Sequence, residues 1–216
     1  MNKIIEMPFS IPFYTQRVTE ESWKADGFLD FQEGLSWEMR GCGIASLRMI
    51  VDGFLQQAGE SYCEKQGTMI HKGLKKEAYK QGVGWIHQGL AEMAGEYGLL
   101  GVANRGKNAA DVAAEIEKGK PCIVSVSPRF AGGKPDENGN PYGKGGHLVV
   151  AYGCEMDEEG EPVAFLIHHP SCFLEYNWPR HWVSIEDFDA SFSGNYIAFQ
   201  KDESRNRGFH PHPLAF

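Results

Sequence analysis

The chain has 216 residues, of which 42% are hydrophobic and 12% aromatic, and its formal net charge is -8 at pH 7. This length and apolar content are sufficient for one sizeable core. The negative charge, with no basic patch interleaved with aromatic residues, excludes nucleic acid and anionic membrane as expected partners. The N-terminal MNKIIEMPFS holds no apolar stretch of signal-peptide length, and no run is long enough to span a bilayer, so a cytoplasmic location is expected.

Five cysteines are spread along the chain, at Cys42, Cys63, Cys122, Cys154 and Cys172. Their number is odd and no two form a close pair, which disfavours a disulfide framework or a structural zinc site. We expect reduced thiols, most of them buried as small hydrophobic groups.

The predicted elements begin with IPFYTQ, residues Ile11 to Gln16, a short strand or extended arm. A polar, irregular stretch over 17–40 follows it. From Cys42 the period becomes helical, and Gly59 is the predicted stop. The apolar positions that carry this period are Ile44, Leu47, Val51, Phe54 and Leu55. Cys42 is therefore expected at a junction between a loop and a helix.

Three further helices are predicted before residue 120. They run roughly from Thr68 to Lys80, from Ile86 to Tyr97 and from Ala109 to Glu117. Pro121 follows the last of them, two residues after a glycine, which is typical of a helix exit.

After Pro121 the pattern favours strands. We expect them at Cys122 to Val126, from His147 (HLVVAYG), over VAFLIHH and at Asn195 to Gln200, with a short helix from Ile185 to Ser191. Helices first and antiparallel strands later predict an α+β fold. It would be one domain over 1–200, with a helical half at about 17–120, a β half at about 121–200 and a polar tail over 201–216.

Cys42 is the candidate nucleophile. A cysteine attacks as its thiolate, so its pKa must be lowered, and a helix N-terminus and a neighbouring imidazolium both lower it. Cys42 has the first by position, and Gly41 and Gly43 leave room for an oxyanion site lined by backbone amides. The simpler alternative is a buried structural cysteine at a helix start.

His147 is the candidate base. It opens an apolar strand directly after Gly145 and Gly146, where a histidine can face a cleft, although an ordinary histidine at a strand end would look the same. A cysteine on a helix and a histidine on a distant strand form the arrangement that thiol hydrolases use.

Six motifs in order resemble one known family. GCGIASLRMI is similar to the nucleophile motif of the bacteriocin-processing type of peptidases (double-glycine peptidase-like), a papain-like cysteine peptidase family. IPFYTQ resembles its N-terminal segment, EIEKGKPCIVSV its helix, Gly-(Arg/Lys)-Pro and buried strand, and GGHLVVAYG its histidine strand. FLIHHP stands where the family has a strand ending in Asn-Asp-Pro, and SIEDFDASFSG resembles its closing helix. The match covers residues 8 to 200.

This resemblance implies a bacterial, papain-like enzyme whose active site lies in a cleft between its halves. It implies cleavage of a peptide or amide bond through a thioester acyl-enzyme, without a cofactor. Cys42 would be the nucleophile, His147 the general base and acid, and Gln16 the oxyanion-hole donor. Gln32 is the alternative donor, because the insertion between Gln16 and Cys42 is long for the family.

The third member of the triad departs from the family pattern, because His169 stands where the orienting Asp is expected. An imidazole can accept a hydrogen bond from His147, so a Cys-His-His triad is chemically possible. Its neighbour His168, or Asn177 or Asp157 in predicted loops, could take the role instead. A dyad or a site without turnover is the remaining alternative. A metal site built on both histidines with His181 or Cys172 matches no standard spacing.

Two rival functions stay open at this stage. The same thioester could pass its acyl group to an amine, which would make the protein an acyltransferase. Without the orienting Asp, the chain could instead be an inactive papain-like binding module. The expected partner is a peptide or amide substrate, and the sequence sets neither the cleavage specificity nor the oligomeric state.

Overall fold

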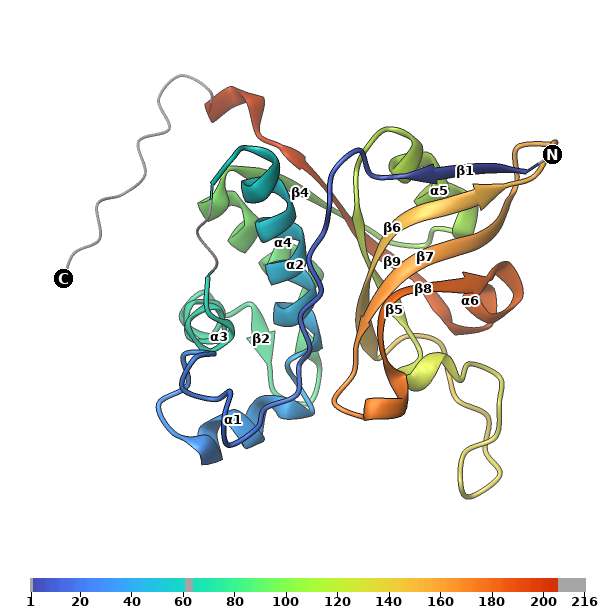
Figure 1. Cartoon of the computed structure of the whole chain (residues 1–216). Helices are drawn as coiled ribbons and strands as arrows, with labels where there is room; N and C mark the ends of the chain where they lie inside the picture. The colour runs from blue at the N-terminus through green and yellow to red at the C-terminus, as the bar shows by residue number, and fades with distance from the viewer. Residues whose placement is uncertain (1, 61–63, 206–216) are drawn as a thin grey trace.

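A computed structural model describes residues 2–60 and 64–205, so Cys63 and positions 206–216 of the predicted tail lie outside the described residues. Figure 1 shows helices α1 to α4 on one side of the molecule and a sheet with α5 and α6 on the other. The helices are α1 (Phe31–Glu38), α2 (Cys42–Gln57), α3 (Gln66–Lys75), α4 (His87–Ala94), α5 (Ala109–Glu117) and α6 (Ile185–Ser191). Short 3-10 turns occupy Gly95–Tyr97, Pro128–Phe130, Leu174–Tyr176 and Glu203–Arg205.

Seven strands form the main sheet in the order β4-β9-β5-β6-β7-β8, with β1 pairing to β6 beyond the end of β5. Every pair in this sheet is antiparallel. The strands are β1 (Lys3–Glu6), β4 (Leu99–Asn104), β5 (Cys122–Val126), β6 (His147–Met156), β7 (Pro162–Pro170), β8 (Asn177–Ser184) and β9 (Phe192–Lys201). The predicted α+β class is confirmed.

Three of these strands were not predicted: β1, β4 and β8. Both β4 and β8 are edge strands of the main sheet, and β1 pairs only with the far end of β6. An edge strand can expose apolar side chains and tolerate proline, as β4 does with Leu100 and Val102 and β8 with Pro179. Their sequences therefore lack the buried alternation by which a strand is recognised. Asn177, predicted in a loop, is the first residue of β8.

Two predicted regions in the helical half are corrected. The stretch over 17–40 is not wholly irregular, because it holds α1, whose N-cap Asp30 accepts a hydrogen bond from the Glu33 amide. The helix predicted to reach Lys80 ends at Lys75. Glu77 has a positive φ of 56°, which a helix cannot continue through, and the chain then enters a two-stranded hairpin of β2 (Tyr79–Lys80) and β3 (Gly84–Trp85).

The contact between α2 and β6 brings the two halves together. Ile44 and Leu47 on the helix and Val149 on the strand are fully buried in one core cluster. The buried hydroxyl of Ser46 donates to the carbonyl of Leu148 over 3.1 Å, so the first turns of α2 are tied to the start of β6. Residues 7–16 run as an extended arm between α2 and the sheet, without strand pairing (Figure 1).

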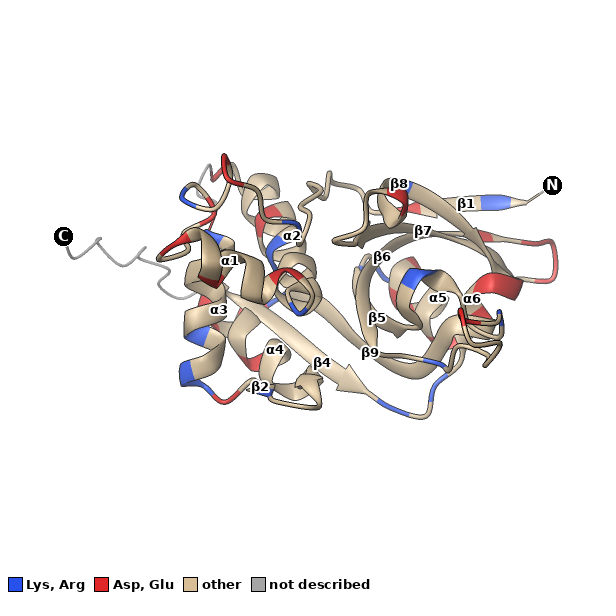
Figure 2. Ribbon diagram, turned by 90° about the horizontal axis from the view of Figure 1, so that it is seen from below, with Lys and Arg blue, Asp and Glu red and all other residues tan. Residues whose placement is uncertain are grey.

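In the view of Figure 2, basic positions are scattered over several elements and interspersed with acidic ones. Within the described residues, no helix combines the length and the apolar character needed to cross a membrane.

Candidate active site

Cys42 is the first residue of α2, as predicted. Its N-cap, Gly41, makes no side-chain hydrogen bond to the helix, which leaves the first backbone amides open. Gly43 is required on packing grounds, because a Cβ there would lie 2.7 Å from Cγ of Trp85. The indole of Trp85 in turn donates to the carbonyl of Arg40 over 2.7 Å. The loop before the nucleophile is therefore held by an aromatic ring from β3.

His147 is the first residue of β6 and pairs with Val126 of β5. Cys42 and His147 line the same cavity, which has a volume of about 340 Å³. The other lining residues are Met39, Arg40, Tyr79, Gly82, Val83, Gly84, Trp85, His87, Ser125, Gly146 and Leu148. The structure thus brings a thiol and an imidazole that are distant in sequence into one site.

Burial favours the neutral forms of both groups. It raises the pKa of the Cys42 thiol, and the backbone groups of Leu148, Gly43 and Cys42 oppose this without cancelling it. Burial lowers the pKa of His147 well below its ordinary value, with His169 adding to the effect. Burial thus opposes the lowering of the Cys42 pKa that was expected at a helix N-terminus. The Cys42 thiol and the His147 imidazole are therefore both neutral at pH 7.

Gln16 is buried beside the loop that precedes Cys42. Its Cβ lies 3.4 Å from where a Cβ on Gly41 would stand, and its Nε2 donates to the carbonyl of Glu38 over 2.7 Å. Gln16 also donates a hydrogen bond to the Cys172 thiol. Burial raises the pKa of Cys172, whereas this bond lowers it by less. Gln32, the alternative donor, is exposed on α1.

His168 has both ring nitrogens engaged. Nε2 donates to the carbonyl of Ile11 over 3.0 Å, and Nδ1 accepts from the backbone N–H of Arg180 over 3.0 Å. Successive side chains of a strand point to opposite faces, so His168 and His169 of β7 face opposite ways. His168 thus fixes the N-terminal arm to the sheet and has no nitrogen left for His147.

His169 lies against His147, with ring centroids 4.7 Å apart and planes at 66°. Its Nδ1 donates to the carbonyl of Tyr176, which fixes the proton on that nitrogen and leaves Nε2 as an acceptor. Among the described residues, neither Nε2 of His169 nor Nε2 of His147 has a hydrogen-bond partner, and both atoms are buried. Burial lowers the pKa of His169 to about 4 despite the Tyr176 carbonyl, so its ring is neutral at pH 7.

Asp157 does not reach this site. It follows the last residue of β6, while His147 is the first, and ten residues of strand span about 33 Å. Its carboxylate accepts the backbone N–H groups of Glu159 and Glu161. The metal reading of the two histidines finds no support, since the described part of the chain holds no group of three potential ligands placed to bind one ion.

Several residues around the site were not predicted from the sequence. Tyr79 and Trp85 come from the β2–β3 hairpin, whose first strand was taken for a helix end and whose second strand was not predicted. Tyr176 contributes only its carbonyl, which no side-chain pattern can indicate. Cys172 approaches the site through Met39, whose sulfur lies 3.3 Å from the thiol. The aromatic content of the hairpin was the one available signal.

Comparison with known proteins defines the class of this fold. A protein described as a C39-like peptidase from Bacillus anthracis is 18% identical, with a TM-score of 0.54, over 92% of this chain and 98% of that one. UfSP from C. elegans is 14% identical with a TM-score of 0.53 and matches 93% of this chain but 35% of its own. A double glycine motif protease from an AMS/PCAT transporter, solved with its leader peptide, is 17% identical with a TM-score of 0.49, over 91% of this chain and 94% of that one. The fold is the papain-like fold of C39-like peptidases.

The family follows from the sequence itself. A family model described as the Peptidase_C39 like family matches residues 10–201. The chain therefore belongs to the Peptidase_C39 like family, and the resemblance found in its motifs is confirmed. No curated protein matches the chain.

Proposed function

We propose that this protein is a cysteine peptidase that cleaves a peptide or amide bond through a thioester on Cys42. One observation carries the proposal: Cys42, at the N-terminus of α2, and His147, at the start of β6, line one cavity. Membership of a family of C39-like peptidases supports it.

His147 would act as general base through Nδ1. This assignment is supported by the other ring nitrogen, Nε2, which is buried without a hydrogen-bond partner among the described residues. Its ring lies against His169, whose Nε2 is also buried without a partner among them. If Nε2–H of His147 donates to His169, the free lone pair of His147 is on Nδ1. His169 would then be a positioning residue, held in its tautomer by the Tyr176 carbonyl.

The reaction would start from neutral groups. As the Cys42 sulfur forms its bond to the substrate carbonyl carbon, the thiol proton passes to His147. His147 then gives this proton to the leaving amine as the C–N bond breaks. Water attacks the thioester with His147 again as base, which releases the carboxylic acid and restores the thiol. A neutral His169 stabilises the transient imidazolium less than a carboxylate does, so we expect slow turnover.

Gln16 would donate to the oxyanion together with the Cys42 backbone N–H. The support is its place against Gly41 and its buried amide, which is already directed at acceptors. One of these acceptors is the Cys172 thiol, and sulfur is a weak acceptor that a negatively charged oxygen can replace.

The test is a product analysis. The protein is incubated with a mixture of synthetic peptides, and new termini are sequenced by mass spectrometry, with Cys42→Ala as the blank. The proposal expects new carboxyl termini that Cys42→Ala does not produce. Products joined to glycinamide, when this amine is added, would indicate an acyltransferase instead. Peptides that stay whole while binding equally to the wild-type protein and to Cys42→Ala would indicate the inactive binding module.

A further inference from the structure

The cavity beside Cys42 carries one sign of charge. Of its lining residues, Arg40 is the single Arg or Lys, and none is Asp or Glu. The chain as a whole has a formal net charge of -8, so an uncompensated cation beside the candidate nucleophile runs against the average of the surface. A cavity with this lining favours an anionic group over a cationic one.

The guanidinium of Arg40 is held in place but not neutralised. Nε and Nη2 both donate to the carbonyl of Ser36, and the group lies over the ring of Trp37, 4.4 Å from its centroid. No salt bridge joins Arg40 to any of the described residues. Nη1 is therefore left to donate into the cavity or to solvent.

The nearest acidic residue in sequence is turned elsewhere. Glu38 stands two positions before Arg40, but its Oε1 accepts the backbone N–H of Val18 over 3.1 Å. The backbone of Arg40 is fixed from the opposite side, because its carbonyl accepts from the indole of Trp85. The cation is thus built into the loop that ends at the nucleophile.

Two neutral polar groups face the same space. His87 lines the cavity with a buried Nε2 that has no partner among the described residues. Burial, with help from Arg105, lowers the pKa of His87, so its ring is neutral at pH 7. Ser125, on β5, is a further polar residue of the cavity lining. A carboxylate has several lone pairs and can accept from a guanidinium and from such neighbours together.

We propose that the substrate carries a carboxylate side chain, Asp or Glu, within a few residues of the bond that is cut, and that Arg40 selects it. The inference rests on the proposed peptidase function and adds the substrate class. A cavity of about 340 Å³ holds only a short peptide segment, so the acidic residue must lie close to the scissile bond. One unpaired guanidinium matches the single charge of a carboxylate.

The experiment compares cleavage by the wild-type protein and by Arg40→Gln. A peptide mixture gives the sequences that the wild type cuts, and one of them is then made in two forms that differ only by Glu and Gln at the selected position. We expect the wild type to cut the Glu form with a kcat/KM at least about tenfold higher, the size of one charge-assisted hydrogen bond. Arg40→Gln should cut both forms at similar rates. Arg40→Glu should prefer a third form of the peptide, with Lys at the selected position.

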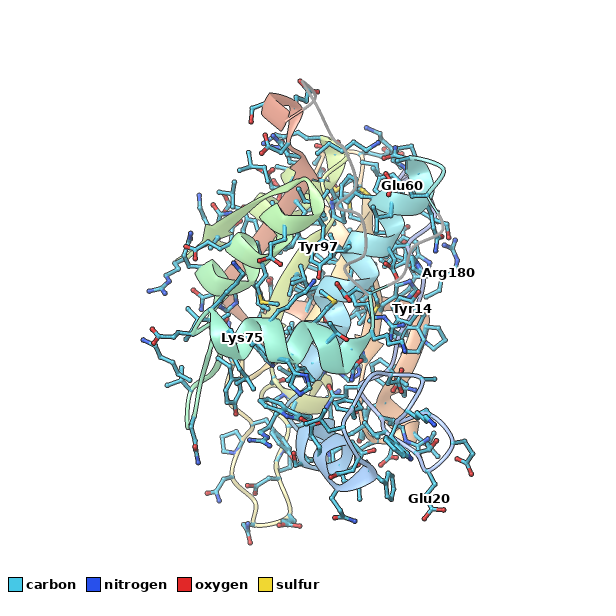
Figure 3. The ribbon with its side chains drawn as sticks, turned by 90° about the vertical axis from the view of Figure 1, so that its left-hand side faces the viewer. Tyr14, Glu20, Glu60, Lys75, Tyr97 and Arg180 are labelled. Carbon is cyan, nitrogen blue, oxygen red and sulfur yellow. The ribbon has the colours of Figure 1, made fainter. Side chains whose placement is uncertain are left out.

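Lys75→Gln is the matched control, since it removes the same charge from an exposed side chain on α3, outside the cavity lining (Figure 3). It should keep the wild-type preference. Equal alkylation of Cys42 by iodoacetamide in Arg40→Gln and wild type would show that the site is intact. Cleavage without enrichment of acidic residues, or a Glu preference that survives in Arg40→Gln, would overturn the inference and leave the peptidase proposal standing. No cleavage of any peptide by the wild type would overturn both.

Discussion

Nε2 of His147 and Nε2 of His169 are both buried, in rings whose centroids are 4.7 Å apart, and neither has a hydrogen-bond partner among the described residues. The carbonyl of Tyr176 holds the proton of His169 on Nδ1. A buried polar atom without a partner loses its hydration without compensation, so a hydrogen bond from one of these nitrogens to the other would be favourable. The two rings therefore favour a histidine that is oriented by a second histidine.

The first prediction concerns His169. His169→Asn can donate its amide to the Tyr176 carbonyl and accept from His147 with its oxygen, so we expect kcat within about tenfold of wild type. His169→Phe keeps the ring volume but offers no acceptor, so we expect kcat to fall by at least about 100-fold with little change in KM. Equal values of kcat for the two variants would contradict the role of His169.

The second prediction is the pH dependence of alkylation. Because burial raises the pKa of Cys42 above its ordinary value of 9.0, the thiol is mostly protonated at neutral pH. The rate of Cys42 modification by iodoacetamide, followed by intact mass, should rise about tenfold per pH unit from pH ~6 to ~9. A rate that stays level between pH ~5 and ~8 would instead indicate a thiolate–imidazolium pair in the resting protein.

His169→Asp is the companion variant for that experiment. A carboxylate beside His147 raises the pKa of its imidazole, and the imidazolium in turn lowers the pKa of the Cys42 thiol. We therefore expect a shoulder of fast alkylation to appear in the neutral range. A profile unchanged from wild type would show that position 169 is not coupled to the thiol.

The third prediction concerns Gln16. Gln16→Glu keeps the shape of the side chain, but a carboxylate in place of the amide repels a developing oxyanion. We expect kcat to fall by about 100-fold or more in Gln16→Glu and by less in Gln16→Ala, with alkylation of Cys42 retained in both. Gln32→Glu, on the exposed face of α1, is the control and should keep wild-type kcat. A wild-type kcat in Gln16→Glu would contradict the role of Gln16 as an oxyanion donor.

The fourth prediction tests how α2 is attached to β6. Ser46→Ala deletes the hydroxyl that donates to Leu148 and leaves a buried carbonyl short of a donor, so we expect a loss of about 1–2 kcal/mol in the free energy of unfolding. Ser127→Ala is the matched control, because its buried hydroxyl has no partner among the described residues and its loss should cost nothing. Urea unfolding measures both, and equal losses would contradict the assignment.

The candidate site residues could be proposed from the sequence because they stand in ordered motifs. Cys42, His147, Gln16 and His169 were each proposed from their position in a motif. In the structure Cys42 and His147 line one cavity, Gln16 lies beside Gly41, and His169 lies against His147. The fold class was predictable for the same reason, since buried strands such as β5 are apolar throughout.

Two features could not be predicted from the sequence, for identifiable physical reasons. His168, the alternative to His169, has both ring nitrogens bonded to backbone groups, and that information exists only in three dimensions. The raised pKa of Cys42 depends mainly on burial, which the sequence does not show. By contrast, α1 left a usable signal, because Asp30 followed three residues later by Glu33 is a capping pattern.

The most direct test of the central claim is the loss of cleavage in Cys42→Ala, measured as kcat/KM on a peptide that the wild type cuts. Cys122→Ala removes a thiol buried in β5 and serves as the control for a missing cysteine. We predict a loss of at least about 1,000-fold in Cys42→Ala and wild-type activity in Cys122→Ala. Cleavage by Cys42→Ala within tenfold of wild type would contradict the assignment of Cys42 as the nucleophile.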